Sequence, residues 1–519
     1  MQDKLGKADI CLFLEGTYPY VSGGVSTWTH ELIKTHNDKS FHLVACLPPG
    51  GDTTIKYEIP SNVKSISNIF LQELPEGVGK FNKKEMDAFF QKIEMPLLNL
   101  QTKPHLDELQ KIFDILHSVG KPVGSKLLLN SEAVWRMLLR MYNTTLGNTC
   151  FLDFFWSWRA LLGGLYSILL SPIPEANVYH SLCTGYAGLL LARAHMETGR
   201  PCIITEHGIY TNERRVEIAS ARWLDDQKAM DLNVNKKMTE KTLRDFWNDT
   251  FVGYSRMAYE AADVIITLFE GNQRLQLLDG ASPDRMHVVA NGIDIDKFIK
   301  IERKEGHPPT LALIGRVVPI KDIKTFIRAC GLLQKSIPDL RAWIMGPTDE
   351  DIEYYKECAE IVDHLGLNNT VIFTGKVDIT HYLGEVDVIA LSSISESMPY
   401  VILEAGCIGI PTVATNVGAC DEMIMGMKSE KPALGQGGAI AELANPKSIA
   451  DEVLRLLTEK PYYESCSKAI KERVARYYNK SFQKEAYHQL YSTLVRLGQH
   501  QEQIERVHGR DWVRSTQAI

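Results

Sequence analysis

The sequence lacks the features that mark several common classes of protein. Its longest apolar run, residues 160–170, is shorter than the roughly 20 residues that a membrane-spanning helix needs. The net charge of −7 at pH 7 argues against nucleic acid or an anionic membrane as the main partner. The polar residues 1–7 lead directly into an apolar segment, so we expect no signal peptide and a cytoplasmic location.

The ten cysteines form no pattern typical of a metal site or a disulfide framework. They are scattered, without a C-x-x-C pair or a group of cysteine and histidine at ligand spacing. We therefore expect them to act as small apolar residues in a reducing compartment. Two acidic triplets are present. Residues 294–296 follow a turn, and residues 349–351 are typical of the acidic first turn of a helix, so neither predicts a metal site. No metal or other cofactor is expected.

The length and the order of apolar segments predict two α/β domains. The chain has 519 residues, of which 45% are hydrophobic and 23% charged, as is ordinary for soluble domains. Short apolar runs alternate with helical patterns, which is typical of parallel sheets, and the polar run 300–309 predicts a linker. We predict a first domain over 1–298 with a helical, aromatic-rich insertion at about 70–170, a second domain over 299–480, and a C-terminal helix with a polar tail over 481–519 that returns to the first domain.

Strand ends in the first half carry candidate site residues. A predicted strand is followed by a loop with Gly23 and Gly24, where a phosphate or sugar can approach the backbone without meeting a Cβ; a plain turn is the alternative. The loop is not G-x-G-x-x-G, so no dinucleotide fingerprint is present. Two further strands end at His180 and His207. Ligands bind at such ends, so we predict a cleft role for both histidines rather than a structural one.

The most informative stretch is a strand, loop and helix with two carboxylates eight residues apart. Glu396 lies in the loop, and Pro399 opens the helix, because proline is favoured at a first helical position. The N–H groups of Tyr400 and Val401 then form an anion site. Glu404 follows on an otherwise apolar helix, where a lone carboxylate is costly to bury. It either pairs with a basic side chain or awaits a ligand with hydroxyls, such as a ribose; a core helix with one structural glutamate is the alternative.

The loops after two more predicted strands of the second half are candidates for binding a nucleotide. The turn after predicted strand 311–314 holds Arg316 and Lys321, and two fixed cations there are placed to hold a diphosphate. The alternative is a pair of surface cations. A later loop with Lys376 and Val377 is placed to lay its backbone and Val377 against a flat base.

The motifs occur in an order typical of one enzyme family. Along nearly its whole length the chain resembles the retaining GT-B glycosyltransferases of family 4. This resemblance implies an α/β fold of two doubly wound Rossmann-like domains that face a cleft, and a UDP-sugar donor. The residues that carry it are Gly23, Gly24, His207, Arg316, Lys321, Glu396 and Glu404.

The resemblance also implies roles for these residues. Arg316, Lys321 and the helix N-terminus would hold the diphosphate and stabilise the charge that develops on the leaving phosphate, without a metal. Glu396 and His207 would orient the transferred sugar. In this family, retention is usually explained by front-face attack, with the leaving phosphate oxygen taking the acceptor proton. The residues expected to bind the nucleotide sugar are Gly23, Gly24, Lys376, Val377, Tyr400, Val401 and Glu404.

Three stretches of the first half resemble a narrower group, the PelF family, which comprises cytoplasmic glycosyltransferases of Pel exopolysaccharide assembly. They are residues 14–26, 151–156 and 205–215. This likeness implies a growing polysaccharide of biofilm type as acceptor, and work beside an inner-membrane Pel complex. The donor would be UDP-glucose or a UDP-N-acetylhexosamine. A UDP-sugar epimerase and a non-catalytic UDP-sugar-binding protein on the same fold are the alternatives.

Overall fold

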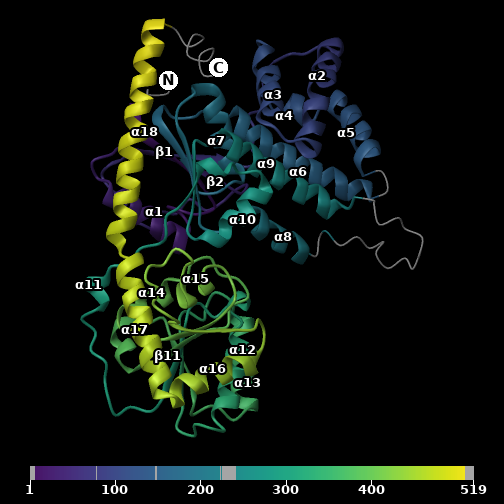
Figure 1. The fold of residues 1–519 in the computed structure, drawn as a ribbon. Helices are drawn as coiled ribbons and strands as arrows, with labels where there is room; N and C mark the ends of the chain where they lie inside the picture. The colour runs from purple at the N-terminus through teal and green to yellow at the C-terminus, as the bar shows by residue number, and fades with distance from the viewer. Residues whose placement is uncertain (1–5, 78, 147–148, 222–223, 225–240, 509–519) are drawn as a thin grey trace. The chain divides into compact units, whose positions relative to one another are not determined.

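Figure 1 shows the computed structural model of the chain. None of its described helices is both long enough and apolar enough to cross a membrane. The end of the predicted polar tail, residues 509–519, lies outside the described part. The residues that the structure describes are 6–77, 79–146, 149–221, 224 and 241–508.

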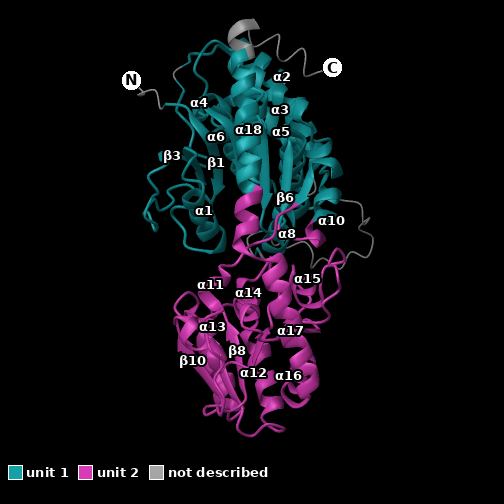
Figure 2. Ribbon diagram, turned by 60° about the vertical axis from the view of Figure 1, so that its left-hand side comes forward, with its two compact units in different colours: residues 1–267, 273–287, 487–519 teal, residues 268–272, 288–486 magenta. Residues whose placement is uncertain are grey.

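The chain forms two compact units, which Figure 2 shows in different colours. The first unit contains residues 1–267, 273–287 and 487–519, and the second contains residues 268–272 and 288–486. Each unit is built around one parallel sheet.

The predicted linker 300–309 is fixed to the second unit. The backbone N–H of Lys304 donates to the carbonyl of Gly384 at 2.9 Å, and its ammonium donates to Glu385 at 2.8 Å. The neighbouring guanidinium of Arg303 lies 3.3 Å from Asp387. The long continuous part of the second unit therefore begins before this segment, at residue 288.

Among the described residues, seven strands form the sheet of the first unit, in the order β3-β2-β1-β4-β5-β6-β7. The pairs from β3 to β6 are parallel. The strand order reverses between β1 and β4, and ligands bind at such switch points of open parallel sheets. The strands are β1 (Ala8–Glu15), β2 (Phe41–Leu47), β3 (Val63–Phe70), β4 (Ala176–Ser181), β5 (Cys202–Glu206), β6 (Val264–Thr267) and β7 (Met286–Val288).

Helices cover both faces of this sheet. Successive residues of a strand point to opposite faces, and buried strand residues contact helices on each side. Tyr179 of β4 stacks on Phe13 of β1, with ring centroids 5.6 Å apart, in the core shared with α7. The next residue, His180, points to the other face and contacts Tyr491 of α18. The predicted doubly wound arrangement is therefore present. The helices outside the insertion are α1 (Gly24–Thr35), α7 (Tyr186–Thr198), α8 (Tyr210–Ser220), α9 (Leu243–Ala261), α10 (Glu270–Asp279) and α18 (Lys480–His508).

A layer of helices between β3 and β4 enlarges the first core (Figure 1). Its buried side chains, among them Phe89, Ile112, Met137 and Trp158, join the same apolar cluster as Phe13 of the sheet. This helical layer therefore packs onto the sheet and does not form a core of its own. Its helices are α2 (Lys83–Thr102), α3 (Leu106–Ser118), α4 (Ser125–Leu128), α5 (Glu132–Thr145) and α6 (Phe151–Leu170).

The sheet of the second unit has six strands among the described residues, in the order β10-β9-β8-β11-β12-β13, and their pairings are parallel. Its switch point lies between β8 and β11. The strands are β8 (Thr310–Ile314), β9 (Arg341–Met345), β10 (Val371–Gly375), β11 (Val388–Leu391), β12 (Thr412–Thr415) and β13 (Gly438–Ala441).

Helices again cover both faces. Leu311 and Leu313 of β8 point into a cluster that also contains residues of α12 and α16. Ala312, between them, points into a second cluster with residues of α14 and α17. The prediction of two doubly wound α/β halves is therefore confirmed. The helices are α11 (Ile295–Phe298), α12 (Ile323–Leu333), α13 (Ile352–His364), α14 (Tyr400–Cys407), α15 (Cys420–Met425), α16 (Pro446–Thr458) and α17 (Lys460–Tyr477).

Candidate functional site

The switch point of the second sheet brings together two predicted site residues. Lys321 follows β8, Glu396 follows β11, and the Nζ and Oε1 atoms of this pair lie 2.5 Å apart. The two side chains are only 19% and 10% exposed. The hydroxyl of Ser393 donates to the same Oε1 atom at 2.5 Å. The structure therefore joins the predicted cation and the predicted carboxylate in one partly desolvated pair.

Hydrogen bonds between the two loops fix the geometry of this pair. The hydroxyl of Ser392 is 2.9 Å from the carbonyls of both Lys321 and Asp322. The N–H of Ile394 donates to the carbonyl of Ile320 at 2.8 Å. Sequence reasoning did not assign this positioning role to Ser392. The signal was there, because a serine that directly follows a buried strand stands at the carboxyl edge of the sheet.

Gly418 is a second residue of this site that the sequence analysis missed. Its φ of +56° lies in the left-handed region, and an added Cβ would come within 2.2 Å of the carbonyl oxygen of Glu396. The following N–H, of Ala419, donates to the carbonyl of Ser397 at 2.7 Å. The loop after β12 thus supports the backbone of Glu396, and only glycine permits that approach.

The second predicted cation, Arg316, does not join this pair. Its guanidinium forms an ion pair with Glu350, and both side chains are about half exposed, at 54% and 47%. Exposed pairs of this kind contribute little to stability. Arg316 is thus a partly exposed cation beside Glu350, whereas Lys321 is fixed in the pair with Glu396, and the diphosphate-binding role of Arg316 stays a prediction.

The helix after Glu396 starts one residue later than predicted. Tyr400 is its first residue, and Pro399 is the N-cap, with φ −72° and ψ 118°. Proline fixes φ but not ψ, and the extended ψ keeps Pro399 outside the helix. The N–H groups of Tyr400 and Val401 still stand in the first turn of this helix. Their role in anion binding stays a prediction.

Glu404 is a lone carboxyl on the apolar face of α14. Its neighbours Leu403 and Ala405 are fully buried, and the described residues donate no hydrogen bond to it. Burial raises the pKa of Glu404 to about 7, and the charge of Lys297 offsets only part of this shift. An ion pair between Glu404 and a basic side chain is absent from the described structure. A carboxyl that awaits ligand hydroxyls and a core helix with one structural glutamate both stay open, so the ribose-binding role of Glu404 stays a prediction.

We expect Glu404 to make the second unit less stable as the pH rises from about 4.5 to about 7. The native carboxyl keeps its proton up to about pH 7, whereas the unfolded one releases it near its ordinary value of 4.5, so rising pH favours the unfolded state. The Glu404→Gln variant should lack this loss, which is worth roughly 1–3 kcal/mol. Urea unfolding at pH 4.5 and pH 8 measures it. The same pH dependence in both proteins would contradict the assignment.

The loop predicted to face a base follows β10. Val377 is partly buried against the apolar cluster that contains α14, and Tyr400 packs against the same cluster. Lys376 is exposed. Gly375, with φ +68°, makes the turn that ends the strand. The base-binding role of this loop stays a prediction.

The predicted residues of the first unit lie at the carboxyl ends of β1 and β5. Gly23 and Gly24 begin α1 and are exposed, and an added Cβ on either would meet no atom within 4 Å. Trp28, one turn further along α1, packs edge-on against the ring of His207, with centroids 4.6 Å apart. Burial lowers the pKa of His207 to about 4, so its imidazole is neutral at pH 7.

The prediction of a ligand-facing role is wrong for His180. Its side chain is fully buried, with Nδ1 2.8 Å from the hydroxyl of Tyr491 and Nε2 2.9 Å from that of Thr205. Tyr491 belongs to α18, which covers this face of the sheet. The structural alternative holds for His180 because a helix from the far end of the sequence encloses it.

Two further carboxylates, not predicted as site residues, lie at strand ends of the first unit. Glu206, the last residue of β5, is fully buried and accepts hydrogen bonds from Tyr259 at 2.5 Å and Gln276 at 2.9 Å. These donors offset only part of the burial, which raises the pKa of Glu206. Glu15, the last residue of β1, accepts a hydrogen bond from Tyr210 at 2.7 Å. Their position at strand ends was the available signal.

The acidic triplets stand at the N-termini of two helices in the described part of the chain. Asp351 caps α13 by accepting a hydrogen bond from the N–H of Tyr354 at 2.9 Å, and Asp294 is the N-cap residue of α11. Within the described residues, no three His, Cys, Asp or Glu side chains gather as a metal site requires. The expectation that no metal or cofactor is needed stays a prediction.

Two family models match the chain. The model described as "Domain of unknown function (DUF3492)" covers residues 8–284, and the model "Glycosyl transferases group 1" covers residues 294–473. The first match covers more than half of the chain. The chain belongs to the DUF3492 family. Its second half, which holds the Lys321–Glu396 pair, is a group 1 glycosyltransferase domain.

Curated relatives match part of the chain. It is 27% identical over 289 residues to the D-inositol 3-phosphate glycosyltransferase of Saccharomonospora viridis, which covers 49% of this chain and 64% of that protein. It is 28% identical over 179 residues to the protein of the same description from Mycobacterium sp. (strain KMS), covering 32% and 40%. The chain thus spans less than two thirds of the length of these relatives.

Solved structures match nearly the whole chain. A complex of Anabaena Alr3699/HepE with UDP aligns with a TM-score of 0.57 at 14% identity, covering 93% of this chain and 100% of that one. Sucrose-phosphate synthase from Thermosynechococcus elongatus aligns with a TM-score of 0.55 at 14% identity, covering 94% and 99%. At this identity the likeness shows the fold alone, and it confirms the predicted GT-B class.

Proposed function

We propose that the chain is a retaining glycosyltransferase that transfers a hexose from a UDP-sugar to a growing exopolysaccharide of Pel type. The observation that carries the proposal is the Lys321–Glu396 pair, partly desolvated at the switch point of a group 1 glycosyltransferase domain. A donor of this class is supported by the similar Anabaena protein, which is described in complex with UDP and with UDP-glucose. The donor here is UDP-glucose or a UDP-N-acetylhexosamine.

The nucleotide is proposed to bind the second unit. Its uracil lies on the loop of Lys376 and Val377, and its ribose hydroxyls donate to the carboxylate of Glu404. A ribose diol suits this carboxyl because the described residues give it no donor of their own. The diphosphate contacts Lys321, Arg316 and the first turn of α14, where helix N–H groups favour an anion.

The chemistry follows from where charge develops. When the bond between the anomeric carbon and the phosphate oxygen breaks, negative charge grows on the UDP leaving group, and Lys321 stabilises it. Glu396, held by Lys321 and Ser393, orients the sugar by accepting a hydrogen bond from one of its hydroxyls. The acceptor hydroxyl attacks from the face that the phosphate leaves and passes its proton to the phosphate oxygen. The configuration is thereby retained without a protein nucleophile.

The predicted site residues of the first unit are proposed to have the roles that the family resemblance implies. His207 contributes a neutral imidazole, since its pKa of about 4 lies far below 7, and it hydrogen-bonds the transferred sugar. Gly23 and Gly24 allow backbone approach to the donor. A cytoplasmic position beside an inner-membrane Pel complex is proposed on the likeness of residues 14–26, 151–156 and 205–215 to the PelF family.

The test is UDP release by the purified protein against a panel of UDP-sugars, with and without a Pel-type oligosaccharide. We expect release with one donor, an increase with acceptor, and loss of release in the Glu396→Ala variant. The anomeric configuration of the product, read by NMR, tests retention. Isomerised donor without acceptor would instead identify an epimerase. Tight UDP binding without release, unaffected by Glu396→Ala, would identify a sensor.

A further inference from the structure

The helical layer of the first unit contains a cavity of about 310 Å³ that is separate from the residues of the proposed transferase site. It lies among the segment before α5, helix α5 itself and helix α6. Ten residues line it, and they include aromatic, polar and charged side chains. A volume of this size is in the range of small-ligand sites in proteins.

Aromatic side chains form one part of the lining. Trp135 of α5 and Phe155 of α6 lie with ring centroids 5.8 Å apart. Trp135 also packs edge-on against Phe151, with centroids 5.7 Å apart, which holds its indole in place. Although packed in this way, Trp135 remains 44% exposed. The cavity thus presents a fixed, accessible aromatic surface.

A buried donor in the lining has no acceptor. Trp158 of α6 is 2% exposed, and its indole Nε1–H finds no hydrogen-bond partner among the described residues. A buried N–H that is left unpaired destabilises the folded protein. A ligand that brings an oxygen acceptor to this N–H would relieve that cost, whereas an acyl chain has no acceptor to offer.

The polar part of the lining favours a neutral ligand. Arg159 and Glu132 contribute one charge of each sign. The guanidinium of Arg159 is already bound to the carbonyl of Leu129 at 2.9 Å and to Oδ1 of Asn130 at 3.0 Å. The carboxylate of Glu132 pairs with Arg136. Because both charges are engaged, what the lining offers a ligand is aromatic surface and the Asn130 amide N–H groups, with the indole of Trp158 among the lining side chains.

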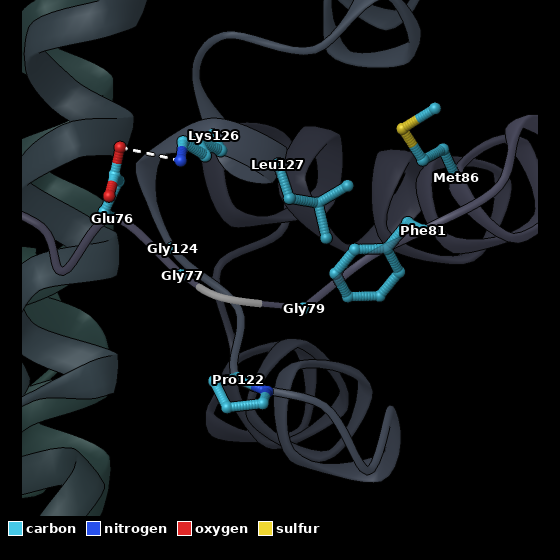
Figure 3. A pocket seen from close by; sticks show the side chains of 9 residues that line it. All are labelled: Glu76, Gly77, Gly79, Phe81, Met86, Pro122, Gly124, Lys126 and Leu127. Carbon is cyan, nitrogen blue, oxygen red and sulfur yellow. Dashed lines mark ion pairs between the residues drawn. The ribbon is translucent and has the colours of Figure 1, made fainter.

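A smaller cavity in the same helical layer lacks the features of the larger cavity and serves as a comparison. It has about 140 Å³ and is lined by glycines, by Phe81, Met86 and Leu127, and by the ion pair of Glu76 with Lys126 at 2.7 Å (Figure 3). None of its described lining residues has a buried polar side-chain atom without a partner. Nothing there calls for a hydrogen-bonding ligand.

We propose that the larger cavity is an accessory saccharide site that holds pyranose units of a neutral polysaccharide. A pyranose has apolar C–H faces that stack on aromatic rings and a rim of hydroxyl oxygens that accept hydrogen bonds. Its C–H faces therefore match Trp135, and its hydroxyl oxygens are acceptors of the kind that the N–H of Trp158 lacks. The inference rests on the proposed function for its biological setting, since an enzyme that extends a chain gains from holding that chain at a second point.

The test is binding of two neutral probes, cellohexaose and chitohexaose, to the full-length protein by calorimetry and saturation-transfer NMR. We expect a dissociation constant on the order of 1 mM or tighter for at least one probe. Trp135→Ala should weaken binding by more than about tenfold, and Trp158→Phe by roughly three- to tenfold. Trp156→Ala is the matched control, because Trp156 of α6 is 58% exposed and does not line the cavity.

The outcomes separate this inference from the proposed transferase activity. Binding that is unchanged in Glu396→Ala and in the presence of UDP, and lost in Trp135→Ala, supports the accessory site even if no UDP-sugar is consumed. Failure of both probes to bind overturns it, as does equal binding by Trp135→Ala, Trp158→Phe and the unsubstituted protein. Binding of decanol without either saccharide would also overturn it and assign the cavity to acyl chains.

Discussion

The Lys321→Ala variant is expected to lose roughly a hundred- to a thousandfold in the rate of UDP release while its second unit stays folded. The ammonium group is the one described cation that contacts Glu396, and it stands where charge would develop on the leaving diphosphate. Its partly buried position makes the effect large, because electrostatic stabilisation is stronger where water is excluded. Initial rates with the accepted UDP-sugar measure it, and circular dichroism checks the fold.

Lys324 provides the control for this experiment. It lies on the helix that follows Lys321 and pairs with Glu357 at 2.5 Å on the surface. Lys324→Ala removes the same charge and the same side chain, but it should leave the rate within about twofold of the original, as is typical of surface substitutions. Near-normal turnover by Lys321→Ala, or an equal loss in both variants, would refute the role given to Lys321.

The sequence predicts the sheets well because their strands are buried on both faces. Strands such as Phe41–Leu47 read as continuous apolar runs, as is typical of parallel sheets. Strand β3, Val63–Phe70, was missed. It is the edge strand, and only Ile69 among its residues is buried. With little of it buried, the segment carries no continuous apolar signal, so pattern alone could not find it.

The site was predicted as separate pieces, and the topology joins them. Lys321 and Glu396 are 75 residues apart in sequence, but β8 and β11 are paired neighbours, so the loops after them meet. This meeting of the two loops could be predicted, because ligand sites of open parallel sheets lie at the carboxyl ends of the strands. The support from Gly418 was not predictable, because it depends on how closely the loop after β12 approaches Glu396. The prediction for His180 was wrong for a similar reason, because the helix that encloses it lies some 300 residues further along the sequence.

The largest expected loss of stability comes from Arg473. This side chain of α17 is fully buried, and its guanidinium donates to Glu430, which is itself 3% exposed, at 2.8 Å and 3.1 Å. It also donates to the carbonyls of Ile424 at 2.8 Å and Gly435 at 2.5 Å, which fixes the loop between α15 and β13. The Arg473→Met variant leaves a buried carboxylate without its partner. We expect a loss of roughly 3–5 kcal/mol in the free energy of unfolding.

A double variant distinguishes the ion pair from the loop contacts. Arg473→Met together with Glu430→Leu removes both charges, so no unpaired carboxylate is buried, and we expect it to recover more than half of the loss. Urea unfolding of the single and double variants, followed by circular dichroism, measures this recovery. If the double variant is as unstable as Arg473→Met alone, the stability comes instead from the bonds to the carbonyls of Ile424 and Gly435, which both variants lack.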